Sequence, residues 1–194
     1  QHSGILESQE RLDPFTAFQQ GHEDPRGPEF AGLRTVEDPD ALRPELESIL
    51  AGASTQSDPK ERARLIDGLL DFLPLLTAAD ALPLLERSIE QFGPLAPLER
   101  VQVIEDALLV AGQLGRADIV RSLVVQMQDA IEELTAEHLS QTAESLAKGL
   151  RSLRRVGLQQ EAAELLNAVI RRASGRDIQS VTARVAVAGG LSGV

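Results

Sequence analysis

Apolar residues recur at helical spacing along the chain from residue 58 onward, and no convincing segment alternates apolar and polar side chains as a strand would. Capping residues and Gly or Pro breaks divide this region into helices. Asp58 followed by Pro59 is typical of a helix start, and Glu61 has the spacing of a capping box. The predicted helices span 58–72, 77–92, 97–114, 117–133, 135–156, 158–174 and 177–194.

The first 57 residues have a different pattern, because Pro and Gly interrupt them repeatedly and acidic residues outnumber basic ones. The stretch 21–28 has almost no apolar content and is typical of a loop. We therefore predict an irregular N-terminal arm over 1–57, with one short helix near 40–50 that tolerates Pro44 in its first turn. The residues expected to pin this arm onto the helical body are Phe15, Phe18 and Phe30.

The helical region repeats itself at an offset of 42 residues, since Leu114-Gly115 recurs as Val156-Gly157. Apolar positions match on both sides of the turn at this offset. The matched pairs are Ile104 and Leu146, Leu108 and Leu150, Ala111 and Leu153, Val120 and Ala162, Leu123 and Leu165, and Val124 and Leu166. The helix over 97–114 carries two apolar stripes, which predict two buried faces, whereas the helix over 135–156 carries one.

Short connections force neighbouring helices to run antiparallel. Together with the repeat, they predict an all-α fold in which helical hairpins stack as a short right-handed α-solenoid behind the irregular arm. The repeat domain spans 58–194, with hairpins at about 58–92, 97–133 and 135–174 and a final helix at about 177–194. A single closed helical bundle is the alternative all-α architecture.

The turn region over 150–166 resembles that of a tetratricopeptide repeat. That family places a Gly before the second helix and an Ala five residues later, where the two helices approach closely. Gly157 and Ala162 stand at these places, and in the earlier hairpin Gly115 and Val120 do. The resemblance implies a helical-repeat fold that binds proteins.

The resemblance covers about residues 98–174 and departs from the family in two ways. The family repeat has 34 residues, whereas this one has about 42 and is nearer in length to HEAT-type repeats. Aliphatic residues such as Leu146 and Leu153 fill positions where the family has aromatic rings. For these reasons, we assign no peptide-binding residue of that family to this chain.

Composition and charge exclude several classes of protein. The chain has 194 residues, 19 basic and 30 acidic, for a net charge of −11, and its acidity argues against a nucleic-acid partner. It has no Cys and so no disulfide, thiolate nucleophile or Cys-ligated zinc. With no apolar run long enough for a bilayer and no signal-peptide pattern, we expect a soluble protein of unassigned compartment and no membrane insertion. Because the chain starts at Gln1 without Met, we interpret it as an excised or processed domain.

The sequence contains no motif of a metalloprotease, P-loop enzyme or serine hydrolase, and its histidines lie far apart. The Gly-rich stretch 189–193 lacks the lysine of a phosphate-binding loop. The acidic pair Glu105-Asp106 and the neighbours Asp67 and Asp71 are interpreted as solvated helix surface. We therefore predict that the protein is not an enzyme and has no catalytic residue, cofactor or metal ion.

One basic surface stands out, because Lys148, Arg151 and Arg155 are spaced three and four residues apart and share a helix face. Such a face could dock an acidic segment or a phosphate group of a partner. The alternative is structural: Arg154 and Arg155 complement the negative helix C-terminus, and Glu144 pairs with Lys148.

These patterns favour a non-catalytic scaffold that presents a groove or ridge to another protein or peptide. The alternative is a structural spacer or self-association domain excised from a larger protein. The final predicted helix starts a new hairpin without its second helix, so self-association would use the C-terminal end.

Overall fold

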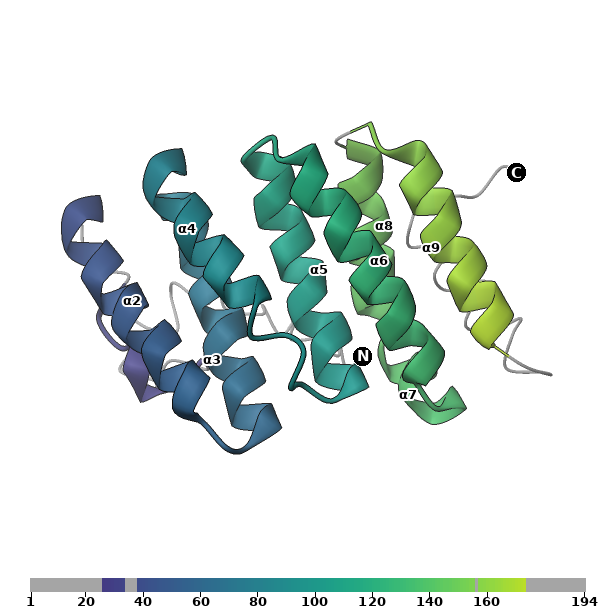
Figure 1. Ribbon diagram of the computed structural model, residues 1–194, viewed down its shortest axis with the longest axis horizontal. Coiled ribbons are helices and arrows are strands. Elements are labelled where there is room, and N and C mark those ends of the chain that lie inside the picture. The colour runs from purple at the N-terminus through teal and green to yellow at the C-terminus, as the bar shows by residue number, and fades with distance from the viewer. Residues whose placement is uncertain (1–25, 34–37, 156, 174–194) are drawn as a thin grey trace, which may run out of the picture.

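The computed structural model describes residues 26–33, 38–155 and 157–173. Every regular element in these ranges is a helix, which confirms the predicted all-α class (Figure 1). The predicted final helix over 177–194 and two of the phenylalanines, Phe15 and Phe18, lie outside the described residues.

The helices form two layers. One layer contains α2, α4, α6 and α9, and the other contains α3, α5 and α8 (Figure 1). Contacts run from α3 to α5 to α8 in the second layer, which is compatible with the predicted stack; its right-handed solenoid geometry stays a prediction. The elements are η1 (Pro28–Phe30), α2 (Pro39–Thr55), α3 (Pro59–Phe72), η3 (Leu73–Leu75), α4 (Ala78–Ile89), α5 (Pro97–Gln113), α6 (Ala117–Glu133), α7 (Ala136–Gln141), α8 (Ala143–Arg155) and α9 (Gln159–Arg172), where η denotes a short 3₁₀-helix.

Helix α5 lies at the centre and contacts α3, α4, α6 and α8. Side chains on both of its apolar stripes are buried, which confirms the two faces expected from the sequence. The residues buried on these stripes are Val101, Val103, Ile104, Ala107, Leu108, Val110 and Ala111. Helix α8 is one-sided instead: Leu146, Leu150 and Leu153 are buried, whereas Lys148 and Arg155 are exposed.

The turns after α5 and α8 have the same backbone geometry. Gly115 has a φ of 69° and Gly157 a φ of 80°, a left-handed conformation that favours Gly. The N–H of Arg116 donates to the carbonyl of Ala111 at 3.0 Å, and 42 residues later the N–H of Leu158 donates to that of Leu153 at 2.9 Å. This is the Schellman pattern of helix ends. The repeat seen in the sequence is therefore also a repeat of turn structure.

The prediction of one continuous helix over 135–156 is wrong, because Thr142 separates α7 from α8. Its buried side-chain hydroxyl donates to the carbonyl of Leu139 at 3.1 Å. Helical backbone bonds nevertheless continue, since the Leu146 N–H donates to the Thr142 carbonyl at 2.9 Å. The break is therefore local, and a Thr hydroxyl bonded back to its own helix is a recognised cause of such bends.

The short element η1 is held on α3 by an aromatic contact. Phe30 is fully buried and stacks on Phe72, with ring centroids 5.9 Å apart. Gly68 makes room for this ring, since a Cβ there would lie 2.5 Å from it. The guanidinium of Arg26 covers Phe72 at 4.6 Å. The expected pinning of the arm is confirmed for Phe30.

Two helix starts refine the expected boundaries. Asp58 caps α3 by accepting the N–H of Lys60 at 3.0 Å, as predicted. The capping box with Glu61 does not form, because the Asp58 N–H donates to Gln56 Oε1 at 3.4 Å and Glu61 pairs with Arg64. Helix α2 extends beyond the predicted range 40–50 at both ends and packs against α3 and α4.

Candidate binding surface

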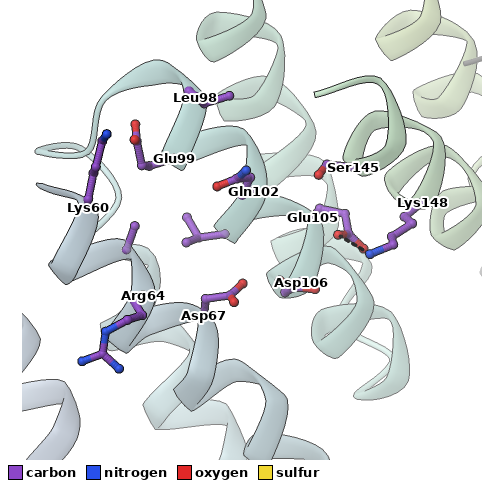
Figure 2. Close-up of a pocket in the computed structure, with 12 residues that line it drawn as sticks. Lys60, Arg64, Asp67, Leu98, Glu99, Gln102, Glu105, Asp106, Ser145 and Lys148 are labelled. Atoms are coloured by element: carbon purple, nitrogen blue, oxygen red, sulfur yellow. Dashed lines mark ion pairs between the residues drawn. The ribbon is translucent and has the colours of Figure 1, made fainter. Parts of the chain in front are cut away.

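A groove of about 590 Å³ crosses the layer of α3, α5 and α8 (Figure 2). Three consecutive helices of the layer contribute polar side chains to its lining. They include Lys60, Arg64 and Asp67 from α3, Gln102, Glu105 and Asp106 from α5, and Ser145 and Lys148 from α8. The groove therefore presents positive, negative and neutral polar groups within one surface.

The carboxyl groups of this region gather between α3 and α5. Asp106 makes a side-chain hydrogen bond with Asp67, and Glu105 lies beside Asp106 in the sequence. The interpretation of these acids as solvated helix surface is wrong for Glu105, whose side chain is only 7% exposed. Its burial follows from the central position of α5, which has neighbours on several sides.

The pKa of Glu105 is raised to about 7, chiefly because burial disfavours the charged carboxylate. Lys148 opposes this shift, with its Nζ 3.9 Å from Glu105 Oε2 (Figure 2). The negative charge of Asp67 adds to the increase, whereas the positive charge of Arg151 lowers the pKa. Glu105 is therefore only partly ionised near neutral pH.

The pKa of Asp106 is also raised above its ordinary value, first by burial. The hydrogen bond with Asp67 raises it further, and the charges of Glu105, Asp67 and Asp71 act in the same direction. Neighbouring negative charges disfavour ionisation of the Asp106 carboxyl group. The Asp106 carboxyl group, at this contact between α3 and α5, is therefore harder to ionise than an exposed aspartate.

The structure divides the predicted basic face into two parts. Lys148 lines the groove and pairs with Glu105 of α5, not with Glu144 as the structural alternative predicted. Arg151 and Arg155 instead line a separate hollow of about 320 Å³. Arg154 and Gln159 complete the lining of this hollow.

Gln159 was not among the residues selected from the sequence. It belongs to the start of α9, and the turn at Gly157 brings it beside the end of α8. The sequence signal that could have found it is the hairpin itself, because antiparallel helices place the residues flanking a turn close together. We call Arg151, Arg154, Arg155 and Gln159 the arginine hollow.

The described residues contain no group of three or more His, Asp or Glu side chains that could hold a metal ion. None of the helices in the described ranges has both the length and the apolar character needed to cross a bilayer. What the surface does offer is a set of hydrogen-bond donors and acceptors along the groove, followed by the arginine hollow.

Comparison with known proteins places this chain in a family. Residues 1–194 match the family described as "Domain of unknown function (DUF8586)", and the chain belongs to it. No curated protein and no solved structure matches the chain. A function for the protein therefore has to be argued from its own groove, hollow and charges.

Proposed function

We propose that this member of the DUF8586 family is a non-catalytic interaction module that binds another protein along the groove. The observation that carries this proposal is the groove of about 590 Å³, which three neighbouring helices of one layer line together. A surface built across several stacked helices is the kind of extended surface that helical repeats use to bind partners. The resemblance of the turn regions to tetratricopeptide repeats supports the same function.

The chemistry of the lining favours a peptide over a small apolar ligand. Small-molecule pockets are mostly apolar with a few polar groups, whereas this groove is lined chiefly by charged and amide side chains. Gln102 is exposed on α5 and Ser145 is half-buried on α8, and both can exchange hydrogen bonds with a peptide backbone. Charged groups of both signs would select the side chains of the partner.

Ion pairs hold the Arg64 side of the groove in place. Arg64 pairs with Glu61 on its own helix and with Glu29 of η1 at 2.9 Å. These contacts fix a guanidinium at one side of the groove before any partner binds. A fixed group loses less conformational entropy on binding than a free one, so this anchoring supports a binding role.

Site-specific photocrosslinking in cells that express the protein tests the proposal. A photoreactive amino acid replaces Gln102 in the groove, and the matched control replaces Ser122, which is exposed on α6 in the other layer. We expect a discrete crosslinked protein from position 102 and none from position 122. The same products from both positions, or no product from position 102, would contradict the proposal.

Self-association is a second candidate, because two large aliphatic side chains are exposed on helices that contact each other. Val125 of α6 is 56% exposed and Ile170 of α9 is 40% exposed. Light scattering over a range of protein concentrations distinguishes this candidate. A dimer that Val125→Glu with Ile170→Glu converts to a monomer would support it, and a monomer at all concentrations would exclude it.

A further inference from the structure

The arginine hollow differs from the rest of this acidic protein. Three of its four lining residues are arginines, and the fourth is a glutamine. The chain as a whole carries a net charge of −11. We propose that the arginine hollow binds an acidic peptide segment of the partner through its Asp or Glu carboxylates, an inference that rests on the proposed binding function.

The backbone brings these guanidinium groups together. Arg154 and Arg155 lie three and four residues after Arg151, so both are its neighbours across one turn at the end of α8. The turn at Gly157 then adds the carboxamide of Gln159 from α9. The hollow thus collects donors from two helices, and no acidic side chain lines it.

The chemistry of these groups suits an oxyanion. Guanidinium has five N–H donors and no acceptor, and its planar shape matches a carboxylate with two parallel hydrogen bonds. Arginines in the last turn also interact favourably with the negative helix C-terminus. The two roles are compatible, because the several N–H donors of one guanidinium can contact the helix end and a carboxylate together.

The position of the hollow favours a peptide over a nucleic acid. Lys148 of the groove and Arg151 of the hollow are three residues apart on α8, so the two surfaces follow one another along the helix. A protein partner lying in the groove can extend an acidic segment into the hollow. A long polyanion would instead run onto the acidic side chains of the groove, Asp67 and Glu99, and be repelled.

Fluorescence anisotropy with a labelled oligoglutamate peptide tests this inference on the full chain, with a Gly-Ser peptide of equal length as the reference ligand. The test variant is Arg151→Gln with Arg155→Gln. The matched control is Arg87→Gln with Arg171→Gln, which removes the same charge from exposed positions of α4 and of the far end of α9. Circular dichroism checks whether each variant keeps its helical content.

We expect the oligoglutamate peptide to bind at low ionic strength and the test variant, which lacks two of the three guanidinium groups, to bind it about tenfold more weakly. The control variant should bind it like the unmodified protein. Equal weakening in both variants, or equal binding of the Gly-Ser peptide, would overturn the inference. Displacement by inorganic phosphate, but not by sodium chloride of equal ionic strength, would overturn it in favour of a phosphate site.

The inference and the proposed function can fail separately. Crosslinking at Gln102 with unchanged peptide binding in the Arg151→Gln, Arg155→Gln variant would overturn only the role of the hollow. Peptide binding that depends on the hollow, with no crosslinked product from position 102, would overturn only the proposed groove function.

Discussion

The hairpins α5–α6 and α8–α9 share one backbone turn but have different surfaces. Both turns have a left-handed Gly and the same pair of helix-ending hydrogen bonds. At the offset of 42 residues, however, Asp106 of α5 corresponds to Lys148 of α8, and Leu109 corresponds to Arg151. The first hairpin therefore contributes carboxyl groups to the groove, whereas the second contributes Lys148 to the groove and Arg151 to the arginine hollow.

The difference between the hairpins shows which positions determine the fold. Equivalent apolar residues such as Leu108 and Leu150 are buried in both helices, so they and the turn glycines define the hairpin. Positions between them vary in charge without changing the turn. The proposed binding surfaces consist of these variable positions, which explains why the repeat predicts the architecture better than it predicts the site.

The largest expected effect comes from truncating the shared core leucine in each hairpin. Leu108→Ala should lower the free energy of unfolding by about 4 kcal/mol and Leu150→Ala by about 3 kcal/mol, within the range for buried leucines. The cost is higher in α5 because four helices surround it and leave less room to collapse into the cavity. Urea unfolding followed by circular dichroism measures both. An equal or larger loss for Leu150→Ala would show that the two hairpins do not differ in this way.

The carboxyl groups of α5, which have no counterpart in α8, should make stability depend on pH. The folded-state pKa of Glu105 is about 7 against an ordinary value of 4.5, and the pKa of Asp106 is raised too. The folded protein therefore binds more protons than the unfolded chain in this window. The contribution of Glu105 to stability is fully present below pH about 4.5 and is lost as pH rises through about 7, a loss on the order of 3 kcal/mol.

Urea unfolding at a series of pH values checks this dependence. In Glu105→Gln with Asp106→Asn, the decrease in stability above pH about 4.5 should largely disappear. The control variant, Glu90→Gln with Asp129→Asn, changes two exposed acids and should retain it. A variant of Glu105 and Asp106 with the pH dependence of the unmodified protein would refute the assignment.

Substitution of the two turn glycines should have equal effects on stability if the hairpins share one turn structure. Gly115→Ala and Gly157→Ala should each cost about 1–2 kcal/mol, because a Cβ is strained at positive φ while space around both positions is open. Gly52→Ala in helix α2, where the space is equally open, should instead stabilise by about 0.5–1 kcal/mol. Thermal unfolding compares the three variants. Unequal costs at positions 115 and 157 would contradict the shared turn.

The smallest effect concerns the break before α8, which α5 lacks. Thr142→Val keeps the shape of the side chain but removes the buried hydroxyl bonded to Leu139, at a cost of about 1 kcal/mol. In the control, Thr55→Val removes an exposed hydroxyl bonded to Gly52, also three residues earlier, and should cost less because water replaces the bond. Chemical denaturation measures both variants. A larger loss at Thr55 would reject the role of burial.

The sequence predicted the all-α class, the hairpin turns and the two buried faces of α5. These features depend on local chemistry: Gly115 and Gly157 permit the turn, and the spacing of apolar residues identifies buried faces. The sequence did not predict that Glu105 is buried or that Lys148 contacts it. Both depend on contacts between residues that are far apart in the chain.

The sequence by itself therefore determined the turns after α5 and α8 and which sides of these helices are apolar, since propensity, capping and periodicity act over a few residues. Only the tertiary structure decided that carboxyl groups of α3 and α5 meet, that Phe30 fits against Gly68, and that the basic face is divided between groove and hollow. The physical reason is that burial and electrostatic environment are set by whichever helices pack together. A single helix carries no information about which helix lies opposite it.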